Sequence, residues 1–153
     1  MELKRAERRF KLTTRDYAQL AAFRHALRRF LRFSEAAAAE AGLTGQHYQA
    51  MLIVRGWPED RSVTVNDLAQ QLFIKHNSAV GLADRLAREK LIVREHSRGD
   101  RRKVELHLTH RGRQVLAKLA AEHRRELRQI GPLLNGLFAD LAELEHTEGA
   151  EPR

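Results

Sequence analysis

The stretch from Ser62 to Leu108 decides the fold, and it reads SVTVNDLAQQLFIKHNSAVGLADRLAREKLIVREHSRGDRRKVELHL. Its first half holds two segments with apolar residues at i, i+3, i+4 and i+7, which is the spacing of one helix face. These positions are Val65, Leu68, Ala69 and Leu72, then Ala79, Leu82, Ala83 and Leu86. Thr64 can cap the first segment, with Asp67 three positions on. We therefore expect two short helices joined by a turn at residues 73–74.

The second half of this stretch has the pattern of a β-ribbon with a charged tip. Val104, Leu106 and Leu108 alternate with polar residues, and a period of two is typical of a half-buried strand. The partner strand begins within residues 91–93, and the loop between the strands is long and cationic. Two helices, a turn and a two-stranded ribbon predict a winged helix-turn-helix, which holds one helix in a DNA groove.

The second helix and the ribbon tip concentrate positive charge. Residues 75–103 contain nine Lys or Arg and four Asp or Glu, a local balance of 9 − 4 = +5. The outward face of the helix is small and polar, which suits a major groove about 12 Å wide. The alternative is an ordinary set of solvated charges. Their clustering on this pattern favours a phosphate-binding surface.

The bulk composition restricts the class of protein. The 153 residues carry a formal charge of +8, which indicates an anionic partner, either nucleic acid or a membrane surface. The chain has no cysteine, which excludes disulfides, thiolate zinc sites and thiol-based sensing of oxidants. No apolar run approaches the roughly 20 residues of a membrane span, and the N-terminus lacks a signal-peptide core. We expect a cytoplasmic protein that does not enter membranes.

Long helices are expected on both sides of the ribbon segment. One runs from Thr13 to about Ala41 and ends at Gly42, and another begins after Thr109 and is interrupted at residues 131–132 before a last helix. A monomer of this size cannot easily bury all their apolar faces. We therefore expect a homodimer that places two reading helices on a pseudo-palindromic operator. The alternative is a monomer whose helices fold back on themselves.

These expectations give a mainly α fold with a small β-wing (α+β), a winged helix-turn-helix flanked by long N- and C-terminal dimerisation helices. The expected parts are an N-terminal arm and dimerisation helix (1–43), a DNA-binding domain (44–108), C-terminal dimerisation helices (109–146) and a frayed tail (147–153).

Four short runs resemble the MarR family of bacterial transcriptional regulators: Asp84–Leu86, Leu91–Arg94, Asp100–Arg102 and Leu108–Gly112. The resemblance extends over nearly the whole chain and includes the helix that begins at Leu43–Gln46. It implies a homodimer that binds palindromic promoter DNA and usually represses transcription. It also implies release of the DNA when a small aromatic or phenolic ligand binds.

The resemblance also implies roles for single residues. The helix at 76–89 would read DNA, with Arg102 in the minor groove and Asp100 orienting it. Gly81 departs from the larger polar residue of many members, so we expect base contacts mainly from His76, Asn77 and Ser78. Lys75 and Gly81 complete the expected DNA-binding set, together with the phosphate contacts Arg85, Arg88, Arg98, Arg101 and Lys103.

An effector pocket is a further expectation, between the long helices and the reading unit. The expected ligand is an aromatic acid, whose anion the net positive charge favours. The lining residues would be Phe23, Phe30, Phe33, His47, Tyr48, Met51 and Trp57. The alternative is that aromatic residues at helical spacing simply form core.

Other functions find less support in the sequence. Eight histidines occur without a recognisable ligand spacing, so we expect no metal and no cofactor, and keep a metal-responsive regulator as an alternative. The chain has no nucleophile elbow, phosphate-binding glycine loop or carboxylate pair, so we expect no enzyme. A basic interaction or membrane-surface protein is the remaining alternative.

Overall fold

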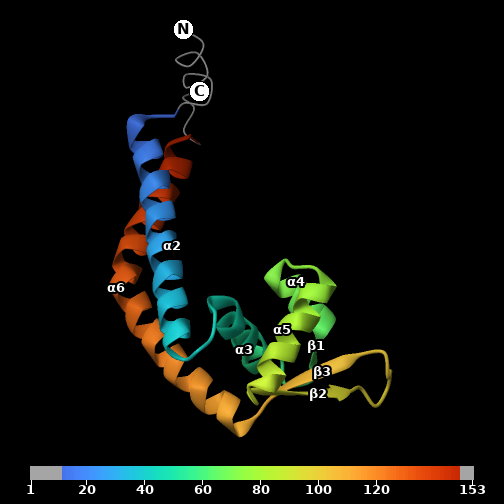
Figure 1. Cartoon of the computed structure of the whole chain (residues 1–153). Coiled ribbons are helices and arrows are strands. Elements are labelled where there is room, and N and C mark those ends of the chain that lie inside the picture. The colour runs from blue at the N-terminus through green and yellow to red at the C-terminus, as the bar shows by residue number, and fades with distance from the viewer. Residues whose placement is uncertain (1–11, 149–153) are drawn as a thin grey trace. The chain divides into compact units, whose positions relative to one another are not determined.

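The computed structural model describes residues 12–148, so the expected arm at 1–11 and the last five residues of the expected tail lie outside it. The elements are α2 (Thr14–Glu40), α3 (Gly45–Gly56), β1 (Val63–Thr64), α4 (Val65–Leu72), α5 (His76–Arg88), β2 (Ile92–His96), β3 (Val104–Leu108) and α6 (His110–Glu148) (Figure 1). A mainly helical chain with one small antiparallel sheet confirms the expected fold class.

The described chain forms two compact units. We call residues 12–33 with 124–148 the helical unit, and Ser34–His123 the winged-helix unit. The winged-helix unit therefore includes residues 34–43 and 109–123, which the sequence had grouped with the flanking helices. No helix in the described part of the chain is long and apolar enough to cross a membrane.

The winged-helix unit is built around the two amphipathic helices that the sequence predicts. The apolar stripes of α4 and α5 are buried almost throughout, and Leu68 and Leu86 are fully enclosed. The sheet has the order β1-β3-β2, with Arg94 opposite the buried Leu106. The loop between β2 and β3 projects beyond α4 and α5 (Figure 1). These elements confirm the predicted helices, turn and ribbon.

Strand β1 is the element that sequence reasoning missed. Val63 pairs with Leu106 and Thr64 with Glu105, so the strand is only two residues long. Two residues cannot display an alternating pattern. Thr64 is also the N-cap of α4, so the helix signal dominates this position.

Helix starts follow the expected capping chemistry. Thr44 and Thr64 each accept a hydrogen bond from the backbone N–H three residues on, and each forms a capping box. In the first box the acceptor that returns to the Thr44 backbone is Nδ1 of His47, at 3.1 Å. Thr109 caps α6 by accepting from the Gly112 N–H at 2.9 Å, and its hydroxyl donates to the Lys90 carbonyl.

Three helices end in the same way but with different residues. At the end of α2, the Leu43 N–H donates to Ala38 O and the Gly42 N–H donates to Ala39 O, with Gly42 in the left-handed region. This pair of bonds is the Schellman motif, which favours glycine. Helices α4 and α5 make the same pair of bonds with Phe73 and Lys90 in the left-handed position.

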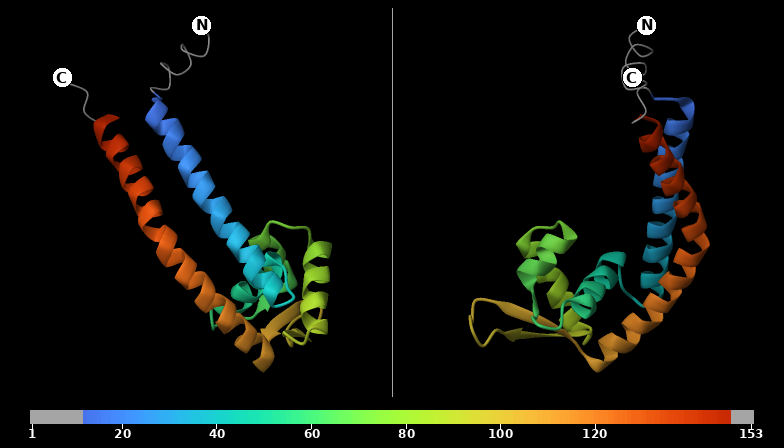
Figure 2. Two further views of the ribbon diagram at one scale, coloured as in Figure 1. Left: turned by 60° about the vertical axis from the view of Figure 1, so that its left-hand side comes forward. Right: turned by 180° about the vertical axis from the view of Figure 1, so that it is seen from behind.

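In the helical unit, α2 and α6 run alongside one another (Figure 2). The rings of Phe23 and Phe138 lie 5.9 Å apart, and Gln19 Nε2 donates to Asp140 Oδ2 at 2.9 Å. Few large side chains are buried here besides Ile130 and Leu137. Large apolar side chains stay exposed on both helices, namely Leu12, Tyr17, Leu20, Leu27, Leu31, Leu127, Leu133 and Phe138.

The predicted break at residues 131–132 is wrong. Helix α6 is continuous from His110 to Glu148 with Pro132 inside it, and it therefore also covers residues 147–148 of the expected tail. An interior proline removes one helical hydrogen bond and costs about 3 kcal/mol. Ile130 and Leu137 are buried on either side of Pro132, and a continuous helix keeps both of them in the core.

Candidate nucleic-acid interface

Helix α5 presents the face that the sequence predicts. Ala79, Leu82, Ala83 and Leu86 are buried, so the helix packs on the unit through one side. The expected reading side is exposed, and it holds His76, Asn77, Ser78, Gly81, Arg85 and Arg88. An added Cβ at Gly81 would meet no atom within 4 Å, so this part of the helix surface is open.

The first turn of α5 is held from α4 and has no side-chain cap. The N-cap residue Lys75 makes no side-chain hydrogen bond to the helix. The ring of His76 is held by Asn66 of α4, with Nδ1 2.7 Å from Oδ1. Free N–H groups at a helix start carry partial positive charge and bind phosphate well. An exposed lysine at this end adds to that attraction.

An ion pair joins α5 to the wing. Arg94 of β2 donates to the Asp84 carboxylate of α5 in a charge-assisted hydrogen bond. Both side chains are partly exposed, so the pair contributes little to stability. Its geometric effect is to connect the middle of α5 to the strand that leads into the wing.

Asp100 organises the tip of the wing. The loop is closed by Ser97 N–H to Lys103 O and Lys103 N–H to Asp100 O, both at 2.9 Å. Asp100 Oδ1 accepts from the Arg102 backbone N–H at 3.0 Å and lies 3.7 Å from the Arg102 Nε. The Arg102 side chain is nevertheless 95% exposed. The tip therefore presents the exposed guanidinium of Arg102 close to the Asp100 carboxylate.

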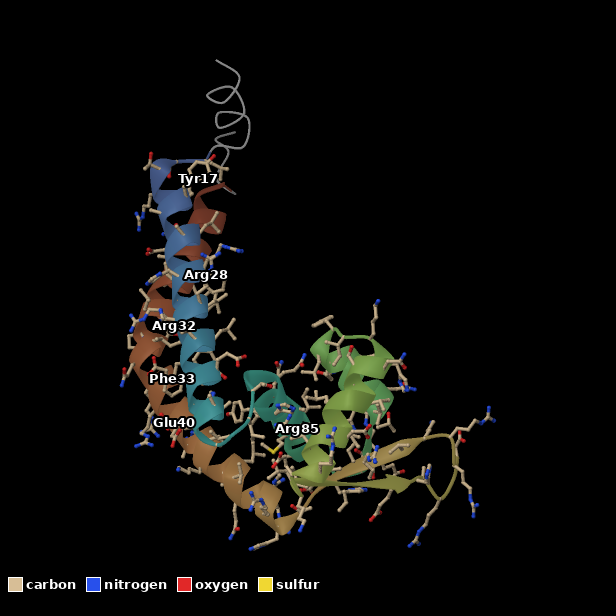
Figure 3. All side chains as sticks on the ribbon, viewed as in Figure 1. Tyr17, Arg28, Arg32, Phe33, Glu40 and Arg85 are labelled. Carbon is tan, nitrogen blue, oxygen red and sulfur yellow. The ribbon has the colours of Figure 1, made fainter. Side chains whose placement is uncertain are left out.

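The expected phosphate contacts are not equivalent. Arg85 pairs with Glu89 at 3.3 Å, and it lies on the side of α5 toward α3 (Figure 3). Burial, and then the charge of Arg85, lower the pKa of His47 on α3. Within the described chain, Arg88, Arg98, Arg101 and Lys103 take part in no ion pair and are exposed. These four cations therefore keep their full charge for a partner.

The residues expected to line an effector pocket are divided among several places. His47, Tyr48 and Met51 are buried in the winged-helix unit, whereas Phe23 packs on Phe138 in the helical unit. Phe30 and Phe33 are half-buried and also belong to the helical unit. Trp57 lines an open cavity of about 530 Å³ together with Arg55, Arg61, His107 and Arg113.

His123 is a buried polar residue that was not singled out as a site. Its ring stacks on Tyr48 at 4.0 Å, and its Nε2 lies 2.9 Å from Ser34 Oγ. Burial raises the pKa of the Tyr48 hydroxyl. The sequence contains one indication of this role, because His123 occupies a position in the apolar stripe of α6 at which a leucine would be expected. No group of three or more His, Asp or Glu side chains in the described chain is arranged to hold a metal.

Comparison with known proteins gives a family match for this part of the chain. A model of the MarR family matches residues 41–103, which span α3 to the wing tip. The winged-helix segment of this chain is therefore similar to the MarR-family domain. Members of this family are transcription regulators that bind DNA. A search of curated proteins finds no match.

Solved MarR-family structures share the fold at low sequence identity. AbsC, a MarR family transcriptional regulator from Streptomyces coelicolor, is 21% identical, with a TM-score of 0.68 over 91% of this chain and 98% of its own. MepR of Staphylococcus aureus in complex with DNA is 18% identical, with a TM-score of 0.67 over 89% and 99%. BpsR of Bordetella bronchiseptica, whose DNA binding is regulated by 6-hydroxynicotinic acid, is 21% identical, with a TM-score of 0.63 over 84% and 91%.

Proposed function

We propose that this protein is a sequence-specific, DNA-binding transcriptional regulator that acts as a homodimer, without enzymatic activity, and represses from a palindromic operator. The observation that carries the proposal is the joint presentation of α5 and the wing. An open, small-faced helix is tied through Asp84 and Arg94 to a ribbon whose tip holds the exposed Arg102. A helix of this kind fits the major groove, and an exposed guanidinium suits a narrow minor groove.

The proposed contacts follow from position and charge. His76, Asn77 and Ser78 stand at the N-terminal end of α5, from which recognition helices usually reach base edges. The free cations Arg88, Arg98, Arg101 and Lys103 would hold phosphates, with Lys75 at the helix start. We expect Arg85 to contribute less to phosphate binding than these residues, because Glu89 already compensates part of its charge.

Self-association is supported by the helical unit. It exposes several large apolar side chains along both of its helices, and exposed apolar surface of this kind can mark an interaction site. A second copy offers the same apolar surface, and a two-fold pairing would cover both. Two reading helices related by that symmetry would select an inverted repeat.

The direct test of the wing is Arg102→Ala, measured by fluorescence anisotropy on an operator duplex. We expect at least a tenfold loss of affinity, within the range of about 1–3 kcal/mol for a specific contact. The matched control is Arg128→Ala, which removes an exposed arginine from the helical unit and should change affinity less than twofold. Equal losses in the two variants would contradict the wing assignment. Binding should also weaken with salt by about 0.9 log units per phosphate neutralised.

An aromatic acid effector is the finer part of the proposal. It is supported by the positive charge of the chain and by the regulation of BpsR by 6-hydroxynicotinic acid. Titration calorimetry with salicylate-like acids should give heat, and the same acids should release bound DNA. No heat together with unchanged DNA affinity would remove the effector from the proposal and leave the DNA-binding function standing.

A further inference from the structure

His76 opens the reading helix, and its ring is held in one orientation. Nδ1 lies 2.7 Å from Oδ1 of Asn66, which stands in the first turn of α4. A carboxamide oxygen has lone pairs and no proton, so it can only accept a hydrogen bond. With the Asn66 amide in this orientation, the Nδ1 of His76 donates, and in the neutral imidazole this places the single ring proton on Nδ1.

The proton on Nδ1 determines what Nε2 can do. In a neutral ring, Nε2 then carries a lone pair and can only accept. His76 is exposed, and its Nε2 makes no hydrogen bond or ion pair with any residue between 12 and 148. The two ring nitrogens face different directions. Because Nδ1 is bonded to Asn66, Nε2 is the nitrogen that remains available to a ligand.

We propose that Asn66 fixes the tautomer of His76, so that His76 accepts a hydrogen bond from the amino group of adenine or cytosine in the major groove. Adenine N6 and cytosine N4 are the donors on that groove edge, whereas guanine offers only the acceptors N7 and O6. A lone pair on Nε2 repels those acceptors. His76 thereby selects against guanine at one position of each half-site. Asn66 is a positioning residue, since it acts through His76 and touches no base.

This inference rests on the proposed function, because it requires α5 to lie in the major groove. The competing explanation is that the Asn66–His76 bond merely joins α4 to α5. A purely structural bond would affect affinity for all sequences alike when it is broken. A bond that sets the tautomer instead changes which base is preferred, and that difference can be measured.

The experiment compares full-length variants on a set of operator duplexes, each with one base pair changed. The wild type should bind about fivefold or more weakly when the base pair at the His76 position is changed to present guanine. In Asn66→Ala the ring is free to exchange tautomers, and this preference should shrink to less than twofold. In Asn66→Asp the carboxylate favours the doubly protonated ring, Nε2 becomes a donor, and guanine should become the preferred base.

A matched control separates the tautomer from simple charge. Gln71→Glu places the same negative charge on another exposed position of α4, and it should weaken binding to all duplexes without altering the preference. A second readout is the ¹⁵N spectrum of the His76 ring in the free protein. It should show a protonated Nδ1 and an unprotonated Nε2 in the wild type, and a mixture of tautomers in Asn66→Ala.

The outcomes are distinct. Unchanged base preference in both Asn66 variants, or a proton on Nε2 in the wild-type spectrum, would overturn the inference while leaving sequence-specific binding intact. A wild type that binds every duplex equally would overturn the proposed function and this inference with it. Loss of guanine discrimination in Asn66→Ala and its reversal in Asn66→Asp would support the assignment.

Discussion

The two units of this chain differ in how far each covers its own apolar side chains. In the winged-helix unit, Met51, Leu68, Leu86 and Leu106 are completely or almost completely buried. In the helical unit, Leu31 is 60% exposed, and similar side chains are exposed along both helices. The winged-helix unit therefore contains a well-buried core of large apolar side chains. The helical unit leaves large apolar side chains exposed, as one side of a protein–protein interface does. This contrast is the physical basis for expecting a dimer.

The largest effect should come from breaking the close packing of the winged-helix unit at Gly112. A Cβ added there would collide with the backbone carbonyl of Leu91, whose carbon lies 2.9 Å away, and backbone cannot move aside cheaply. We expect Gly112→Ala to lower the free energy of unfolding by about 3 kcal/mol. Denaturant unfolding measures this value.

The control lies in the same helix but in the other unit. Gly136 of α6 has no atom within 4 Å of an added Cβ, so Gly136→Ala should be neutral or stabilise the protein by up to about 1 kcal/mol. Equal destabilisation by both substitutions would show that the difference in packing between the units is not real.

The second prediction concerns the exposed face of the helical unit. Leu31→Glu places a charge at its most exposed leucine and should weaken self-association at least tenfold, because burying a leucine contributes about 1.5–3 kcal/mol. Sedimentation equilibrium gives the association constant. Leu52→Glu is the matched control, since Leu52 is 39% exposed but belongs to the winged-helix unit. A dimer that dissociates equally in both variants would place the interface elsewhere.

A smaller effect should follow from relieving strain at the turn before the reading helix. Phe73 holds a left-handed conformation at φ 53° while its side chain is 96% exposed, so its ring gains little from packing. Glycine adopts this conformation without the steric cost. Phe73→Gly should raise the free energy of unfolding by about 1 kcal/mol, measured by denaturant. A loss of stability would mean that the exposed ring has a partner in solution.

The smallest effect should be a dependence of stability on pH through His47. Burial, and then Arg85, lower the pKa of His47 below 6.5, and its Nδ1 accepts the Thr44 N–H in the capping box. The unfolded chain therefore binds a proton before the folded chain does. This contribution is fully present above about pH 6.5 and is lost as the pH falls through the lowered pKa.

The variant His47→Gln tests this pH dependence, because glutamine can accept in a capping box and does not titrate. Denaturant unfolding between pH 5 and 8 should show a shallower loss of stability on acidification than in the wild type. Identical slopes would assign the pH dependence to other groups.

Local patterns in the sequence predicted most of the winged-helix unit. The apolar spacing of α4 and α5, the threonine caps and the alternation in β3 are all properties of neighbouring residues. Features that depend on packing between residues far apart in the sequence could not be predicted from these local patterns. The interruption expected at Pro132 fails because buried residues on either side hold the helix together.

The same distinction between local patterns and contacts between elements applies to the candidate site. Which residues of α5 are exposed could be predicted from helical periodicity, and the structure confirms it. The bonds Asn66–His76 and Asp84–Arg94 could not be predicted in this way. Each joins residues of two different elements that lie ten positions apart in the chain. The expected effector residues share helical spacing, but the fold assigns them to different units, which the sequence pattern does not reveal.

Selection of bound duplexes from a random pool tests the central claim most directly, because it reports partner, symmetry and register together. If α5 and the wing read DNA as a two-fold pair, the selected sequences will converge on an inverted repeat with half-sites about 34–36 Å apart. A pool that stays random after repeated rounds, or converges on a single unrepeated site, would contradict the account.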